Sequence, residues 1–136
     1  MQVKEETMRT TIMMSVKPII LGTSAEALKT AFSLFRRYSL SSCVFDIKVP
    51  FIYRFIAFIS QRKISSSDDR FITMSLDHYI REYGESTYLL IPCTEEHIRF
   101  VERNRDALEN KFLIRSPEQI LGQGELFPTA AKGKDV

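Results

Sequence analysis

Apolar and polar positions fall along this chain in blocks that predict strands and helices in turn. Consecutive apolar residues at 17–21 predict a strand covered on both faces, as in parallel sheets. Gly22 ends that strand, and Thr23 and Glu26 follow with the spacing of a capping box, which predicts a helix start. The apolar stripe expected on this helix has i, i+3, i+4, i+7 spacing and consists of Leu28, Ala31, Phe32 and Phe35.

The same alternation continues to the end of the pattern near residue 121. Further strands are expected at residues 41–45, 61–64, 87–91 and 111–114. Further helices are expected at 69–83, after Cys93 or Thr94 with a break near Asn104, and after Ser116. Strands that alternate with helices at this spacing predict a parallel sheet covered on both faces. We therefore expect an α/β fold, three-layer and doubly wound, with a mostly parallel, Rossmann-like sheet.

The domain boundaries follow from where the pattern begins and ends. The α/β domain is expected at residues 17–121, preceded by a flexible N-terminal extension at 1–16 and followed by an irregular tail at 122–136.

Two of the expected helices are predicted from the spacing of their apolar residues. For the helix at 69–83 these are Phe71, Met74, Tyr79 and Ile80, and for the helix after Thr94 they are Ile98, Val101 and Leu108.

The segment "PFIYRFIAFIS" is apolar almost all round, so its periodicity does not separate helix from strand. We interpret residues 51–57 as a short helix. The segment carries more apolar side chains than one helix face can bury: Phe51, Ile52, Tyr53, Phe55, Ile56, Phe58 and Ile59. Large exposed apolar patches are typical of interaction surfaces, so we expect a homodimer through residues 50–59.

Composition excludes several function classes. The net charge of +2, without a basic run, argues against a nucleic-acid partner. No apolar run approaches the ~18 residues of a membrane span, and no signal peptide is visible, which predicts a cytoplasmic protein without membrane contact.

Cys43 and Cys93 fall in or just after strands and are expected to be reduced core residues. His78 and His97 lack metal-ligand spacing and are expected to have structural roles.

The stretch "LGTSAE" raises the question of a nucleotide site. A glycine at a strand end before a helix presents backbone N–H groups that can hold an anion. Only Gly22 is present, however, and no second glycine allows a pyrophosphate to approach. Asp46 stands where a ribose-binding acid is expected, at the end of the second strand. The pattern favours a well-capped helix over a dinucleotide site, with a substrate carboxylate or phosphate at the same place as the remaining alternative.

The stretch "LLIPCTEEHI" forms a second junction between a strand and a helix. Ligands of such sheets lie outside the carboxyl ends of the strands, which places Thr94, Glu95 and Glu96 at that rim. The alternative explanation is that acidic residues favour the first turn of any helix because of its dipole. The chain has no Walker A loop and no Ser-His-Asp pattern, and it lacks the strand-end acids of a phosphoaspartate switch.

From "KPIILGTSAEALKTAFSLFRRYSL" to "TYLLIPCTEEHIRFVERNRDALENKFLI", the chain resembles the N-terminal domain of bacterial ATP-grasp ligases. These are carboxylate–amine ligases akin to the large chain of carbamoyl-phosphate synthase and to D-aspartate ligase, and the resemblance covers about residues 17–120. It implies a Rossmann-like domain that forms one wall of the active site and helps to receive the carboxylate or amine substrate. The positions that would face the shared cleft are Gly22, Thr23, Pro92, Thr94 and Glu95.

The chain departs from the family pattern after "SPEQIL". The resemblance implies that ATP and magnesium are held by later grasp subdomains, which "GQGELFPTAAKGKDV" does not supply. We therefore expect a catalytically incomplete chain, with no catalytic residue and no cofactor of its own, that works with an absent or separate ATP-grasp domain. The alternative is a stand-alone doubly wound module for binding or dimerisation, without enzyme activity.

Overall fold

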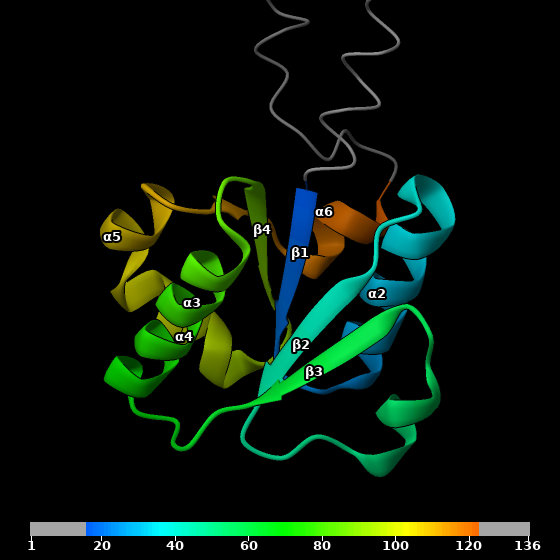
Figure 1. Cartoon of the computed structure of the whole chain (residues 1–136), viewed down its shortest axis with the longest axis horizontal. Helices are drawn as coiled ribbons and strands as arrows, with labels where there is room; N and C mark the ends of the chain where they lie inside the picture. Colours follow the sequence, from blue (N-terminus) through cyan, green and yellow to red (C-terminus); the bar gives the residue numbers. More distant parts are fainter. Residues whose placement is uncertain (1–15, 123–136) are drawn as a thin grey trace, which may run out of the picture.

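The computed structural model describes residues 16–122 as alternating strands and helices (Figure 1). The expected N-terminal extension, apart from Val16, and the expected tail, apart from Gly122, lie outside the described residues. The elements are β1 (Val16–Leu21), α2 (Ala25–Tyr38), β2 (Ser42–Asp46), η1 (Phe51–Phe55), β3 (Ile59–Lys63), α3 (Asp69–Tyr83), β4 (Thr87–Pro92), α4 (Glu95–Arg103), α5 (Arg105–Glu109), β5 (Leu113–Ile114) and α6 (Pro117–Leu121).

The five strands form one sheet in the order β3-β2-β1-β4-β5, and every pairing is parallel. The predicted α/β fold with a Rossmann-like parallel sheet is thus confirmed. The chain moves outward from β1 to β3 and then returns to the other side of β1 with β4. The strand order therefore reverses between β1 and β4, which makes this pair the topological switch point of the sheet.

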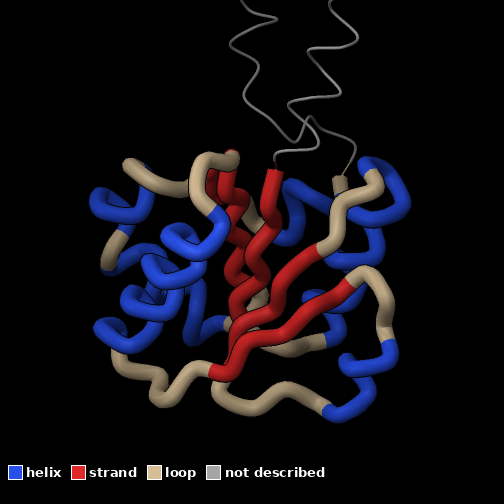
Figure 2. The backbone as a smooth tube through the Cα atoms, viewed as in Figure 1, coloured by secondary structure: helices blue, strands red, loops and turns tan. Residues whose placement is uncertain are grey.

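Helices cover both faces of the sheet and complete three layers (Figure 2). One apolar cluster joins the sheet to α2, η1 and α6, through residues such as Ile20, Leu34 and Ile120. A second cluster on the opposite face joins it to α3, α4 and α5, through residues such as Leu90, Leu76 and Phe100. No helix within residues 16–122 has the length and apolar character needed to cross a bilayer.

The two cysteines lie in different layers. Cys43 belongs to the cluster under α3, α4 and α5, and Cys93 belongs to the cluster under α2 and α6. Both thiols are free and buried, as the sequence predicted. Burial raises the pKa of the Cys43 thiol and raises that of Cys93 to about 12, so both remain protonated at neutral pH.

The buried stripe of α2 differs from the predicted one. The residues that face the sheet are Ala27, Thr30, Ala31 and Leu34, whereas Phe32 and Phe35 are 50% and 44% exposed. Two stripes of this helix satisfy the i, i+3, i+4 spacing, and the structure buries the one with smaller side chains. Alanine and threonine let the helix approach the sheet closely, which a pair of phenyl rings would prevent.

The start of α2 also differs from the prediction. Ser24 rather than Thr23 is the N-cap, and its hydroxyl accepts a hydrogen bond from Ala27 N at 3.1 Å. The Thr23–Glu26 capping box was therefore wrong. The other predicted starts are confirmed: Thr94 caps α4, and Ser116 forms a capping box with Gln119 at α6.

The apolar segment before β3 forms a 3-10 helix, shorter than the helix predicted at 51–57, and β3 begins at Ile59 rather than at 61. Tyr53 and Ile59 are buried, whereas Phe51, Ile52 and Phe55 are 63–73% exposed.

The helix α3 matches its predicted range of 69–83. Of its predicted apolar positions Tyr79 is buried, while Ile72 and Leu76 take the place of the exposed Phe71 and Met74. In α4 and α5, Val101 and Leu108 are buried as predicted, and Ile98 is exposed.

Candidate functional site

The loops after β1 and β4 meet at the switch point and each leads directly into a helix. The first loop carries Gly22 and Thr23 into α2, and the second follows Pro92 and carries Thr94 into α4. The backbone joins them, because Cys93 N donates to Leu21 O at 2.9 Å. Four of the five residues predicted to face a ligand therefore lie together at the carboxyl edge of the sheet. The fifth, Glu95, is exposed in the first turn of α4.

Gly22 is required at its position for two reasons. Its φ of +101° is a conformation that L side chains rarely adopt. A Cβ atom there would also overlap the methyl group of Thr94 and would lie 3.1 Å from His97 Nδ1. The missing side chain thus allows the β1 and β4 loops to pack directly on one another.

Ser24 fastens the two loops together. Its hydroxyl donates to Cys93 O at 3.1 Å while it accepts the hydrogen bond that caps α2. Gly22 N donates to Phe45 O at 2.8 Å, which ties the same loop to the end of β2. The entrance of α2 is therefore held from both neighbouring strands.

Asp46 places a carboxylate at the entrance of α2. Its Oδ2 accepts hydrogen bonds from Thr23 N and Thr23 Oγ1, each at 2.9 Å, and its Oδ1 accepts one from Ile47 N at 2.7 Å. A bound phosphate would need N–H groups at this same helix entrance. The protein's own carboxylate already uses Thr23 N, and its charge would repel a second anion.

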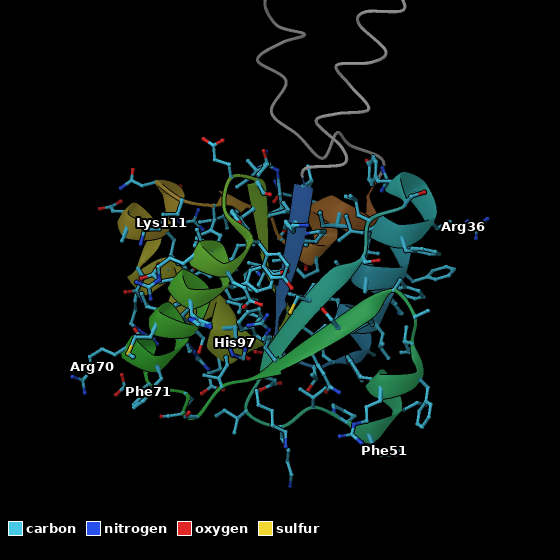
Figure 3. The ribbon with its side chains drawn as sticks, in the orientation of Figure 1. Arg36, Phe51, Arg70, Phe71, His97 and Lys111 are labelled. Atoms are coloured by element: carbon cyan, nitrogen blue, oxygen red, sulfur yellow. The ribbon has the colours of Figure 1, made fainter. Side chains whose placement is uncertain are left out.

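Thr94 and His97 form a second polar pair beneath Gly22. Thr94 caps α4 by accepting from His97 N at 3.3 Å, and its hydroxyl lies 2.5 Å from His97 Nδ1. In the neutral tautomer that carries its proton on Nε2, the Thr94 hydroxyl donates to Nδ1; in the other tautomer, Nδ1–H donates to the hydroxyl. His97, which Figure 3 labels, is buried, with 4% of its surface exposed. Burial lowers the pKa of His97 and outweighs the opposing pull of Asp46 and Glu96, so the neutral ring is favoured.

The rim of the site is acidic. Glu95 and Glu96 occupy the first turn of α4 and are exposed, and Glu95 lies 3.6 Å from Arg99 one turn later. Together with Asp46 they surround two helix entrances that favour negative charge. The arrangement is suited to holding a small cationic or hydrogen-bonding group more than a polyphosphate.

A pocket of about 400 Å³ lies at the same edge, beside the switch point. Pro92 at the end of β4 and Ile114 at the end of β5 contribute to its wall, and α4, α5, α6 and the loop between β5 and α6 supply the rest. Its charged lining is mixed, with two cations and two acids: Arg105, Arg115, Glu102 and Glu118. This volume is in the range of small-molecule sites.

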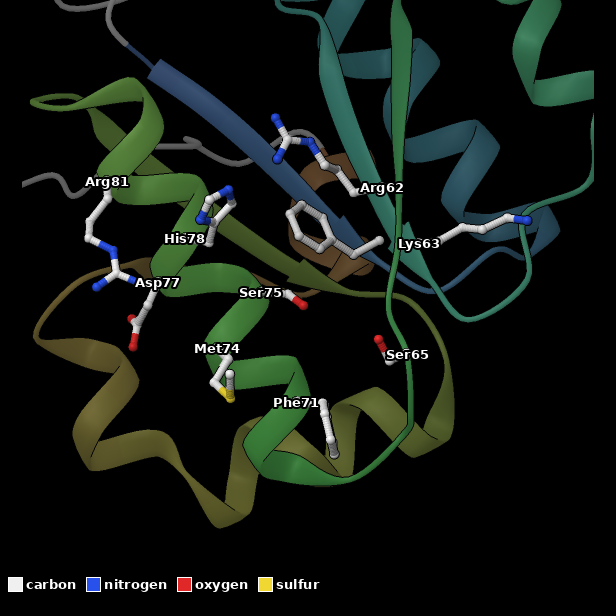
Figure 4. Close-up of a pocket in the computed structure, with 10 residues that line it drawn as sticks. Arg62, Lys63, Ser65, Phe71, Met74, Ser75, Asp77, His78 and Arg81 are labelled. Atoms are coloured by element: carbon white, nitrogen blue, oxygen red, sulfur yellow. The ribbon is translucent and has the colours of Figure 1, made fainter.

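A second pocket, of about 450 Å³, lies between β3 and α3 (Figure 4). Its lining includes several cations, but they do not converge on one point. Arg62 is bound to Glu82 at 2.9 Å, and Lys63 points to the other side of β3. Arg81 points outward from α3. This pocket therefore lacks a focused anion site.

Residues 16–122 contain no group of three or more His, Cys, Asp or Glu side chains that could hold a metal ion. Comparison with known protein families, with curated proteins and with solved structures found no significant match for this chain.

Three residues that shape this site make contacts that the sequence did not predict. Ser24 is adjacent to Thr23, and both are good N-cap residues, so the sequence contains no signal that separates them. Asp46 was noticed for its position but not for its bond to Thr23. His97 was assigned a structural role, and the signal that it contacts Thr94 was their spacing of three residues at a helix start.

Proposed function

We propose that this chain is the N-terminal, substrate-side domain of an ATP-grasp carboxylate–amine ligase and is catalytically incomplete by itself. In this proposal a separate ATP-grasp part holds ATP and magnesium, and the carboxyl edge described above forms the opposite wall of the site. The observation that carries the proposal is the occupation of the α2 entrance by the Asp46 carboxylate.

This observation separates a nucleotide holder from a substrate wall. A domain that grips nucleotide phosphates keeps its first helix entrance open for them. Here Thr23 N and the Thr23 hydroxyl are both directed at Asp46. The fold of a nucleotide-binding protein is thus combined with an entrance that disfavours phosphate, which supports a substrate wall over a nucleotide holder.

The charges of the rim favour the amine over the carboxylate as the group received here. Asp46, Glu95 and Glu96 supply negative charge at the switch point, and the neighbouring pocket at Pro92 supplies room for a small molecule. The neutral His97 adds no positive charge at neutral pH. An amine or an amino acid approaching this edge would meet acceptors at its ammonium group.

A stand-alone binding or dimerisation module is the second candidate. It is favoured by a different observation, the exposed aromatic side chains on α2 and η1. A module of this kind would use those side chains and would leave the carboxyl edge without a ligand.

Calorimetry and NMR together test the proposal. Titration of the purified chain with Mg·ATP is expected to show no tight binding, and micromolar affinity, on the order of 8 kcal/mol, would contradict it. Titration of the ¹⁵N-labelled chain with small amines, amino acids and carboxylates at millimolar concentration is expected to shift the amide signals of Thr23, Thr94 and Glu95.

The test variant is Glu95→Gln, which keeps the size of the side chain and removes its charge. It is expected to weaken the amine-induced shifts while it leaves the spectrum of the free domain unchanged elsewhere. Amides at the carboxyl edge that respond to none of these compounds would leave the stand-alone module as the better description.

A further inference from the structure

Five large apolar side chains are exposed on the side of the molecule formed by α2 and η1. Figure 1 shows both elements on the same side, and Figure 3 labels Phe51 there together with Arg36. We define the aromatic face as Phe32, Phe35, Phe51, Ile52 and Phe55, with the half-buried Phe58 among them. The remaining exposed large apolar side chains of residues 16–122 lie on the loop after β2 and on α3, α4 and α6.

The aromatic face is ordered by contacts between its own rings. Phe35 stacks on Phe58 with centroids 4.8 Å apart, and Phe32 lies 6.1 Å from the same ring. Phe51 and Phe55 meet edge to face at 5.3 Å. Rings that are already packed together lose little conformational entropy when a partner covers them. The face is therefore preorganised for contact.

The size of the face agrees with the apolar part of a dimer interface. An aromatic side chain offers ~150–250 Å², so exposures of 44–73% leave on the order of 500 Å² of apolar surface on these five residues. A standard interface takes about 800 Å² from each partner, and homodimer interfaces are about 65% apolar. One aromatic face can thus supply the apolar area that one partner contributes.

We infer that the aromatic face binds a second copy of this chain in a two-fold dimer. The face is self-complementary, because apolar rings need no opposite charge on the partner. Its charged neighbour suits the same role, since Arg54 lies 5.2 Å from the Phe51 centroid and arginine stacks on aromatic rings. Aromatic residues and arginine are also the residue types enriched at protein interfaces.

This interface differs from the one expected from the sequence alone. Residues 50–59 supply only three of its five exposed side chains, because Tyr53 and Ile59 face the core of their own chain. The other two, Phe32 and Phe35, come from α2. The inference is independent of the proposed function, since none of these side chains takes part in the contacts at the switch point.

Sedimentation velocity of the full chain at 1–100 μM tests the inference. We expect a concentration-dependent dimer whose affinity does not fall as salt rises from 50 to 500 mM, because salt screens contacts between charges and does not weaken apolar contacts. A monomer over the whole range overturns the inference. A dimer that dissociates as salt rises points to attraction between opposite charges and also overturns it.

Single substitutions locate the contact. Phe35→Ser on α2 and Phe55→Ser on η1 are each expected to weaken the dimer about tenfold or more, with unchanged far-UV circular dichroism. The matched control is Met74→Ser on α3. It removes an apolar side chain whose exposure lies between those of Phe35 and Phe55, and it should keep the wild-type affinity. A dimer that survives both phenylalanine substitutions lies elsewhere on the molecule and contradicts the aromatic-face interface.

Discussion

At the scale of single residues, short polar side chains decide how the carboxyl edge is built. Thr23 and Ser24 are neighbours of similar chemistry, yet one bonds Asp46 and the other caps α2 and bonds Cys93 O. The choice depends on a partner 23 residues away in the case of Thr23 and 69 residues away in the case of Ser24. Local spacing therefore predicted a cap in this region but not which residue would form it.

The buried His97 is expected to make stability depend on pH in the window that runs from about 6.5 down to its lowered pKa. Burial lowers the folded-state pKa of His97 below its ordinary value of 6.5. In that window the unfolded chain binds the proton more readily, so the free energy of unfolding falls as the pH falls from 6.5 through the lowered pKa. Urea denaturation at a series of pH values should show this slope, and His97→Gln should flatten it.

A substitution that leaves the His97 ring in place provides the control for this measurement. Thr94→Ser keeps both the His97 ring and the hydroxyl that contacts its Nδ1, and it is expected to keep the wild-type slope. Because glutamine alters packing near Gly22, the informative quantity is the change of stability with pH rather than the stability itself. An unchanged slope in the His97 variant would show that His97 does not carry the effect.

At the scale of elements, the alternation of strands and helices was predictable and the faces of the helices were less so. Gly22, Pro92, Ser116 and Gly84 mark turns through local chemistry, which explains why the limits of α3 and α6 were found. The orientation of α2 depends on which of two stripes lies closer to the sheet. That is a property of packing between elements, so the sequence of the helix alone could not decide it.

The central position of β4 predicts a large loss of stability on truncation of Leu90. This side chain is fully buried between β1 and β5, where it is paired in register with Ile19 and Ile114. Leu90→Ala should cost roughly 2–5 kcal/mol, because the helices above it cannot move far enough to fill the cavity. Chemical denaturation measures this cost. Thr87→Ala, at the exposed start of the same strand, is the control and should change the midpoint little.

At the scale of the whole molecule, the parallel sheet and its two helical layers followed from the sequence pattern, and the meeting of the β1 and β4 loops followed from that topology. Because the strand order reverses at β1, strands β1 and β4 are neighbours, and their following loops bring Gly22 and Thr94 together. Side-chain contacts within the edge, such as the bond from Thr23 to Asp46, depend on tertiary packing and were not predictable from the sequence. The aromatic face was not predictable as a whole either, because its residues come from elements that are separated along the chain.

The placement of the two cysteines gives each helical layer its own chemical reporter. A thiol-specific reagent can reach Cys93 only when α2 and α6 lift from the sheet, and it can reach Cys43 only when α3 moves away. In the single-thiol variants Cys43→Ser and Cys93→Ser, labelling rates under native conditions therefore measure the opening of one layer at a time. Equal rates at every urea concentration would indicate that the molecule opens as one cooperative unit, and unequal rates would identify which layer opens first.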